Sequence, residues 1–208
     1  SGSFDFLAGK PAFNVDLNQW VRGTRLDGLK AFRLHNGRAW DPTRTHEWLA
    51  YELARAAGLL APRVGFALVT VDGEPRGLYV LVEKHDDVLI AARDPAQGDQ
   101  GAILEPAGAF GDLGIGELDE DGAGRIAAAW DEGPEPPPAD AIATLLALDA
   151  ALAREPTEQN IEEVWAIVDR DRFLDYMAWE AVARQQDGYR QGNNWRLFID
   201  CAGLRVEW

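Results

Sequence analysis

Residues 186–195 hold the densest group of side chains in this sequence that could carry out chemistry. An acid, Asp187, is followed by two glycines and by the adjacent amides Asn193 and Asn194. A carboxylate in such a loop can orient a hydroxyl group and accept its proton, and amides a few residues later can help to hold a metal–phosphate group. The same residue types are also typical of a helix end followed by a turn. Spacing alone favours the turn, so the chemical interpretation depends on the rest of the chain.

A helix and a strand are expected on the two sides of this loop. Residues 171–185 have helical periodicity, and residues 195–199 alternate and have strand composition. The loop therefore lies at a helix-to-strand switch. The apolar residues expected on the buried face of the helix are Phe173, Leu174, Met177, Ala178, Ala181 and Val182.

Composition limits the classes of function. The chain has 208 residues, 47% of them hydrophobic, which is enough for one domain or for two small lobes. Its net charge of −15 disfavours nucleic acid, because a phosphate backbone needs a basic track. The sequence contains neither a membrane-length apolar run nor Cys/His spacing typical of zinc sites. Oligomeric state and compartment are not readable from it.

The negative charge is concentrated in the middle of the chain. Residues 1–90 carry eleven basic and eleven acidic side chains, whereas residues 91–139 carry two and eleven. The middle stretch is also rich in glycine and proline, which predicts a solvated, acidic insert. Residues 140–208 then form a third region that contains the 186–195 loop.

The first region reads as a sheet with one helix. Strands are expected over 13–17 and 29–34, and a helix over 42–57, which follows an aspartate and ends before a glycine. An Asp-Gly pair between apolar runs predicts a β-hairpin over 64–83. The helix should bury Trp48, Leu49 and Leu53 against the hairpin residues Phe66, Leu68, Tyr79 and Leu81.

The second half of the chain is mainly helical by pattern. A short strand is expected over 101–104, and helices over 140–153, from residue 160 or 161 to 167, and over 171–185. Strands in the first half and helices in the second indicate an α+β protein, with a sheet-rich lobe carrying one packed helix and a helical lobe. The cleft between two such lobes is the natural place for a ligand.

Taken together, these segments resemble the CotH kinase family, named after spore-coat protein H. No single segment is diagnostic, and the resemblance rests on their order and spacing over most of the chain. The segments that carry it are Phe13–Asn18, Leu26–Lys30, Leu34–Asn36, Asp41–Thr43, Leu49–Leu53, Gly58–Arg63, Asp72–Glu83, Asp169–Tyr176, Asp187–Tyr189 and Asn193–Trp195.

The resemblance implies an atypical, protein-kinase-like fold that transfers phosphate from ATP to serine in a protein substrate, with Mg²⁺ or Mn²⁺. In that interpretation Asp187 is the catalytic acid of the loop, and Asn193 or Asn194 is a metal or phosphate ligand. The strand 77–83 runs toward the hinge that meets adenine. The residues expected near the nucleotide are Leu81, Glu83 and Lys84, at the hinge, with Lys30 as a candidate phosphate partner.

The sequence departs from the family pattern in two places. Family members usually carry a lysine in the first strand where Asn14 stands here, and Lys10 and Lys30 are the nearest lysines, each of which also suits an ordinary surface charge. The family also carries a metal-binding Asp-x-Asp segment that would begin near Trp208, so the expectation is a domain incomplete at one or both ends.

Three functions follow as alternatives. The leading one is a bacterial protein serine kinase, extracellular or in the spore coat by resemblance. The second is a catalytically inactive, CotH-like structural or interaction module of a spore coat or cell surface. The third is a small-molecule kinase that uses the same ATP chemistry.

Overall fold

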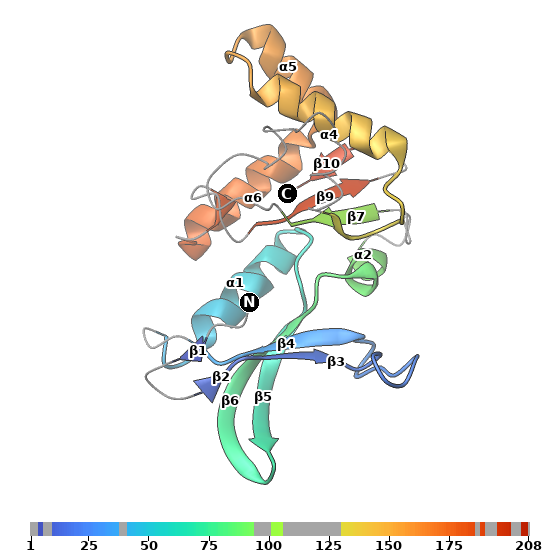
Figure 1. Cartoon of the computed structure of the whole chain (residues 1–208). Coiled ribbons are helices and arrows are strands. Elements are labelled where there is room, and N and C mark those ends of the chain that lie inside the picture. The colour runs from blue at the N-terminus through green and yellow to red at the C-terminus, as the bar shows by residue number, and fades with distance from the viewer. Residues whose placement is uncertain are drawn as a thin grey trace. The chain divides into compact units, whose positions relative to one another are not determined.

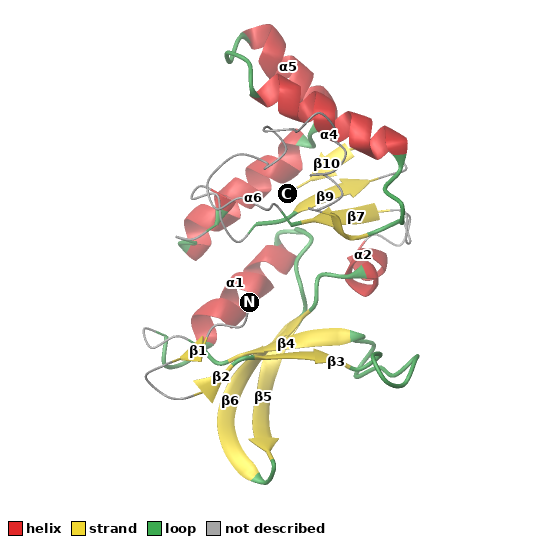
Figure 2. Ribbon diagram, viewed as in Figure 1, coloured by secondary structure: helices red, strands yellow, loops and turns green. Residues whose placement is uncertain are grey.

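The structure is a computed structural model that describes residues 4–5, 10–37, 41–93, 101–105, 130–185, 188–189, 195–200 and 205–207. The chain divides into two compact units, residues 1–89 and residues 90–208. Each unit contains its own four-stranded sheet, and the neighbouring strands of both sheets are antiparallel. The mixture of sheets and helices in Figure 2 confirms the α+β class predicted from the sequence.

The sheet of the first unit has the strand order β3-β4-β6-β5 (Figure 1), and a short antiparallel pair, β1-β2, precedes it in the chain. Strand β6 therefore lies between two partners. The strands are β1 (Phe4–Asp5), β2 (Lys10–Pro11), β3 (Phe13–Asp16), β4 (Ala31–His35), β5 (Val64–Val71) and β6 (Glu74–Glu83).

The predicted β-hairpin is confirmed by the pairing of β5 with β6. Its turn residues Asp72 and Gly73 have φ values of 52° and 83°. Two successive positive φ values match the twist of a two-residue hairpin turn, which explains why an Asp-Gly pair stands there. Strand β6 begins at Glu74 rather than at Gly77, and the register shifts between Val69 and Thr70.

Helix α1 (Thr45–Ala56) begins later than the sequence predicted. Asp41 does not sit directly before the first turn; its carboxylate accepts the His46 N–H at 3.1 Å from outside the helix. The end agrees with the prediction, because Gly58 has a φ of 80° and its N–H donates to the carbonyl of Arg55.

The buried face of α1 was predicted correctly only in part. The expected contact of Trp48 with Phe66 of β5 is present, with ring centroids 6.0 Å apart, and Ala54 is buried. Leu53 is 39% exposed and Leu49 is 49% exposed, so the prediction that both are buried is wrong. A carboxylate oxygen of Glu47 on this helix also pairs with His35 of β4.

The core of the first unit lies on one face of this sheet. Tyr79 is at its centre with no exposed surface, and its hydroxyl donates to the Pro11 carbonyl at 3.0 Å. The ammonium of Lys10 lies 3.9 Å from the centroid of the Tyr79 ring. Leu68, by contrast, is 85% exposed and does not join the predicted contact with the helix. The other core residues are Leu29, Phe32 and Leu34, with Phe13, Val15, Leu17, Ala67, Val69 and Leu81 packed against them.

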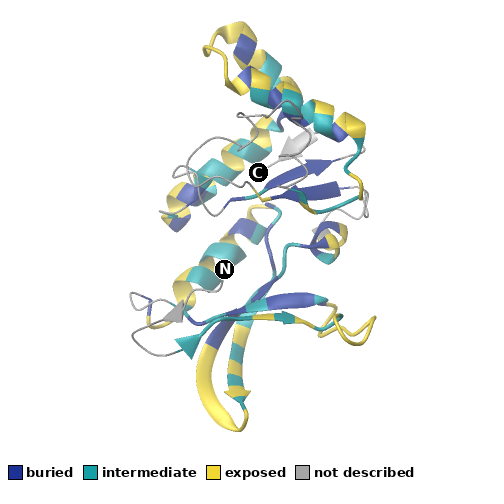
Figure 3. Ribbon diagram, viewed as in Figure 1, coloured by how far each residue is buried: buried dark blue, intermediate teal, exposed yellow. Residues whose placement is uncertain are grey.

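The sheet of the second unit has the order β10-β9-β7-β8. Its strands are β7 (Gly101–Leu104), β8 (Trp130–Glu132), β9 (Leu197–Asp200) and β10 (Arg205–Glu207). Strands β7 and β8 both come from the stretch expected to be a loop-rich insert, and β7 and β9 are buried throughout (Figure 3). The strand predicted over 101–104 is confirmed.

Helices α4 (Ala139–Leu152), α5 (Glu158–Ile167) and α6 (Arg170–Ala183) follow in this unit, and α2 (Asp87–Arg93) crosses the boundary between the two units. Thr157 caps α5 and Asp169 caps α6, each through its side chain. The buried side chains of α4 recur at helical spacing: Ala141, Leu145, Leu148 and Ala151. Within the described residues, no helix is long and apolar enough to cross a membrane.

The inward face of α6 also differs from the prediction. Val182 is 72% exposed and Leu174 is 49% exposed, although both were expected in the core. The fully buried residues of α6 are Glu180 and Ala183. The acidic side chain of Glu180 therefore occupies the buried face of α6, while the apolar Leu174 and Val182 are exposed. The hydrogen bonds of Glu180, described below, explain this orientation.

Candidate functional site

Most of the 186–195 loop lies outside the described residues. This applies to Asp187, Asn193 and Asn194, whose roles therefore stay predictions. The described residues Gly188 and Tyr189 follow Asp187 directly, and Trp195 ends the loop at the start of the strand region.

A buried carboxylate anchors the loop beside Asp187. Glu180, on the last turn of α6, is 2% exposed. Its Oε1 accepts the backbone N–H of Tyr189 at 2.7 Å and the hydroxyl of Tyr176 at 2.9 Å. The second oxygen, Oε2, is also buried and has no hydrogen-bond partner among the described residues. The start of the loop is thus fixed to the helix by one oxygen atom.

Gly188 leaves no room for a side chain at this point. A Cβ atom built on Gly188 would lie against Oε1 of Glu180, well inside van der Waals contact, and 2.8 Å from Cγ of Gln185. The sequence suggested this glycine as a helix stop. In the structure it is instead the residue that lets the loop backbone approach a buried carboxylate.

The two tyrosines remain neutral at physiological pH. Burial, together with the negative charge of Glu180, raises the pKa of Tyr176. The same two causes raise the pKa of Tyr189. A neutral Tyr176 keeps its hydroxyl proton and so continues to donate to Glu180.

Aromatic contacts hold the two ends of the loop together. The Tyr189 ring lies 5.2 Å from the Trp195 ring and 5.9 Å from the Phe173 ring, both at an interplanar angle of 88°. Trp165 of α5 lies a further 5.9 Å from Phe173. Edge-to-face contacts at these distances are favourable. The loop therefore leaves and rejoins the fold at adjacent aromatic side chains.

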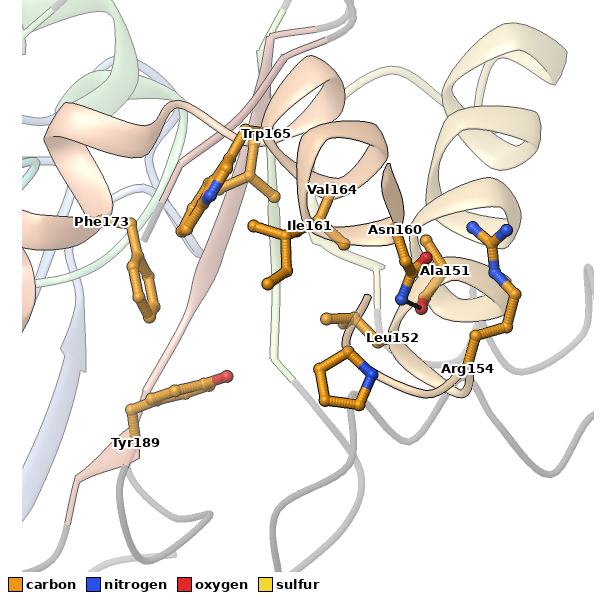
Figure 4. Close-up of a pocket in the computed structure, with 11 residues that line it drawn as sticks. Ala151, Leu152, Arg154, Asn160, Ile161, Val164, Trp165, Phe173 and Tyr189 are labelled. Atoms are coloured by element: carbon orange, nitrogen blue, oxygen red, sulfur yellow. Dashed lines mark hydrogen bonds between the residues drawn. The ribbon is translucent and has the colours of Figure 1, made fainter. Parts of the chain in front are cut away.

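Tyr189 also lines an apolar cavity of about 220 Å³ (Figure 4). Its walls come from the end of α4, from α5, from Phe173 of α6 and from Tyr189 itself. The amide of Asn160 at its edge donates to the Ala151 carbonyl at 2.9 Å, shown by the dashed line in the figure. The cavity therefore borders the anchored end of the loop.

The residues expected at the nucleotide hinge lie at the end of β6 in the first unit. The carboxylate of Glu83 is 2% exposed and binds Arg63, with Oε1 2.8 Å from Nη2 and Oε2 3.1 Å from Nε. The backbone N–H of Arg63 also donates to Oε2 at 2.8 Å. These hydrogen bonds, followed by the charge of Glu83, raise the pKa of Arg63 against the effect of its burial.

The backbone donors of this hinge segment already have partners. The N–H of Glu83 donates to the Arg63 carbonyl at 2.9 Å, and the N–H of Lys84 donates to the Ala31 carbonyl at 3.2 Å. Leu81 sits in the central strand, where it pairs with residues of both β4 and β5. Lys30 forms an ion pair of 2.9 Å with Asp87.

The metal expected from the resemblance was tested against the donor atoms present. Among the described residues, no group of three or more histidine, cysteine, aspartate or glutamate side chains could hold a metal ion. The candidate amides lie outside these residues. The described donor set therefore does not fit a divalent ion by itself.

Sequence reasoning missed Glu180 and Tyr176. The available signal was an acid four residues after a tyrosine, on the same face of a helix and at helical spacing from Phe173. Such a pair is more often exposed to solvent than buried, so its role could be recognised only once burial was known.

Comparison with known proteins supplies the class of the molecule. The family model described as CotH kinase protein matches residues 2–207, nearly the whole chain. The chain therefore belongs to the CotH kinase family, which confirms the resemblance drawn from the sequence. A search of the curated proteins returned no match. Membership in a kinase family indicates ATP, a divalent metal and a protein substrate in general terms.

Proposed function

We propose that the protein transfers the γ-phosphate of ATP to serine residues of a protein substrate, assisted by Mg²⁺ or Mn²⁺. Beside the family match, the observation that carries this proposal is the anchored loop. A buried carboxylate binds the N–H of Tyr189, two residues after Asp187. Fixed backbone next to a reacting group is what a phosphoryl-transfer site requires, because catalysis there is mainly positioning and electrostatics.

In this proposal Asp187 orients the acceptor hydroxyl and takes its proton. Asn193 or Asn194 holds the metal–phosphate group. The ammonium of Lys30 pairs with Asp87 and has further N–H donors with which it could meet a phosphate. At the hinge, the N–H groups of Glu83 and Lys84 already donate within the sheet. Carbonyl oxygens are therefore the groups through which this segment would accept the adenine amino group, with Leu81 packed beside them.

The test is transfer of labelled γ-phosphate from ATP to a basic protein and to an acidic one, with Mg²⁺ and separately with Mn²⁺. Phosphoamino-acid analysis of the product should give phosphoserine. Asp187→Asn should lower turnover about 10²–10⁴-fold while ATP affinity changes little, as expected for a positioned general base. A matched control is Asp175→Asn, which removes an exposed carboxylate of α6 and should retain wild-type turnover.

The outcome separates a kinase from the alternative module. Absence of transfer by the wild-type protein, together with absence of ATP binding in calorimetry, would favour the inactive structural or interaction module. Transfer to a small molecule but to neither protein would favour the small-molecule kinase. Transfer undiminished in Asp187→Asn would show that Asp187 is an ordinary loop residue.

A further inference from the structure

We infer that Glu180 is a positioning residue: its buried carboxylate holds the backbone of Tyr189, two residues after Asp187 in the chain. The inference rests on the proposed function, because a residue that positions a catalytic group needs that group to act. Glu180 itself touches no substrate. It acts through the backbone N–H of Tyr189.

The first argument is the chemical state of this side chain. Glu180 is buried, yet both groups that donate hydrogen bonds to its Oε1 are neutral: a backbone amide and a phenol. Its Oε2 has no partner among the described residues. Burying a carboxylate without full hydrogen bonding costs free energy that an apolar side chain would not. A native structure retains such a group where its strong acceptor is needed.

The second argument is geometry. Asp187, Gly188 and Tyr189 are consecutive, so fixing the peptide N–H of Tyr189 restricts where the Asp187 backbone can lie. The Gly188 backbone also lies so close to this carboxylate that a Cβ atom there would strike Oε1, so only glycine fits between Asp187 and the fixed Tyr189. Displacement of a catalytic group by about 1 Å can lower a rate by about 10²-fold. Glu180 therefore controls turnover more than nucleotide affinity.

The third argument is that neighbouring side chains hold both partners of the hydrogen bond between Glu180 and the Tyr189 N–H. Tyr176 donates to the same oxygen, which orients the carboxylate. Phe173 and Trp195 contact the Tyr189 ring, which orients the residue that the carboxylate binds. A hydrogen bond whose two partners are both held by packing positions atoms more tightly than one between mobile groups.

The experiment compares Glu180→Gln with the wild-type protein by steady-state kinetics and by hydrogen exchange at the Tyr189 amide. The amide variant keeps the shape but replaces a charged acceptor by a neutral one. Turnover should fall about 10–100-fold with the KM for ATP within about twofold, because positioning rather than binding is lost. Exchange at Tyr189 should accelerate at least about tenfold, as expected when a charge-assisted hydrogen bond weakens. Asp175→Asn again serves as the matched control.

A second pair of variants keeps the test decisive if Glu180→Gln is poorly folded. Gly188→Ala places a methyl group against Oε1 and should lower turnover at least about 100-fold. Adding Glu180→Asp to Gly188→Ala should change turnover by less than about twofold further, because the contact that the second change removes is already broken. Full additivity of the two losses in the folded double variant would contradict the inference, because the two residues would then act independently.

The two proposals fail in different ways. If the wild-type protein transfers no phosphate, the proposed function is overturned, and hydrogen exchange alone decides whether Glu180 holds the loop. Tyr189 protection lost in Glu180→Gln supports that role, and protection retained overturns it. If the wild type is active, wild-type turnover in a folded Glu180→Gln variant overturns the inference while leaving the kinase intact.

Discussion

Two carboxylates, one in each unit, are equally buried but have different partners among the described residues: one binds a charged side chain and the other binds only neutral groups. Glu83 and Glu180 are each 2% exposed. Glu83 lies at the end of a central strand and is met by the guanidinium and the backbone N–H of Arg63. Glu180 lies at the end of a helix and is met at one oxygen by two neutral donors. Burial is the same, and only the partners differ.

The difference separates a structural carboxylate from a positioning one. The charge of Glu83 is balanced inside its own unit, so its contribution is to hold β6 beside the start of β5. The charge of Glu180 has no basic partner among the described residues, and its Oε1 accepts the backbone N–H of Tyr189 after α6. Removing each acid should therefore have different consequences for stability and for turnover.

The largest loss of stability is expected for Glu83→Ala. Removing one partner of a fully buried ion pair costs about 3–5 kcal/mol; the loss here should lie toward the lower end, because Glu83 is 2% exposed but the Arg63 side chain is 34% exposed. Denaturant unfolding should show this loss. The control is Glu52→Ala, which breaks a partly exposed pair with Arg55 and should cost only about 0.3–0.5 kcal/mol. Replacing both Arg63 and Glu83 by methionine should recover most of the stability; no recovery would mean that shape, not charge balance, matters there.

A smaller loss is expected for Glu180→Leu. The replacement keeps the volume and removes the buried charge, but it leaves the Tyr189 N–H and the Tyr176 hydroxyl without their acceptor. Each unsatisfied buried donor costs about 1–3 kcal/mol, but removing the buried charge also removes the cost of its desolvation, which offsets part of this loss. The unfolding free energy should therefore fall less than in Glu83→Ala. A loss equal to that of Glu83→Ala would place both carboxylates in the structural category.

The contrast between the two units also explains which parts of the fold were readable from sequence. The hairpin was predicted because its turn chemistry is local: Asp72 and Gly73 adopt the positive φ values that their residue types favour. Helices α1, α4, α5 and α6 were predicted with boundaries within a few residues for the same reason, since caps such as Asp169 act on their own first turn, whereas the short helix α2 was not predicted. Local rules sufficed wherever the interaction was local.

The faces of α1 and α6 were not readable, because polar contacts from elsewhere in the fold determine them. Apolar periodicity placed Leu53 and Val182 inside, yet Glu47 pairs with His35 and Glu180 binds the loop backbone. Periodicity assumes that only apolar groups seek the interior. The candidate loop was visible from its residue types, but its anchor was not, because a glutamate in a helix is most often exposed.

Tyr176→Phe should weaken the Glu180 network by one hydrogen bond. The expected loss of unfolding free energy at neutral pH is about 0.5–1.5 kcal/mol, less than for removal of the carboxylate. The pKa of Tyr176 is raised by burial and by Glu180, so the native state keeps the phenol proton at a pH where the unfolded chain has released it. Stability should therefore fall as the pH rises above about 10, and fall less steeply in Tyr176→Phe. Unfolding curves recorded between neutral and alkaline pH would test this; an unchanged slope would mean that Tyr176 does not carry the effect.

The smallest effect on stability is expected at Asp86. Within the described residues, Asp86 is, like Glu180, a buried acid with one unpartnered carboxylate oxygen, but it does not bind the candidate loop. Asp86 is buried, and its Oδ1 accepts the N–H of Val88 at 3.0 Å and of Leu89 at 3.3 Å, while Oδ2 is unpartnered among the described residues. Burial raises the pKa of Asp86, against the hydrogen bonds from the backbone. The native state then holds a proton that the unfolded chain has lost, so this acid's stabilising contribution declines as the pH rises above the unfolded value near 3.8.

Asp86→Asn should remove that decline while keeping the same acceptor for the two N–H groups. Asn and Asp cap helices about equally well, so the gain at neutral pH should stay within about 1 kcal/mol. The control is Asp87→Asn, which breaks the exposed pair with Lys30 and should not stabilise the protein. Thermal unfolding between pH 4 and pH 7 measures both variants. A large loss of stability in Asp86→Asn would mean that its charge is needed, as at Glu83. A small gain in stability without a change in turnover would show that Asp86 has no role in the reaction. A buried carboxylate with one unpartnered oxygen would then matter for turnover only where its other oxygen binds the candidate loop, as that of Glu180 does.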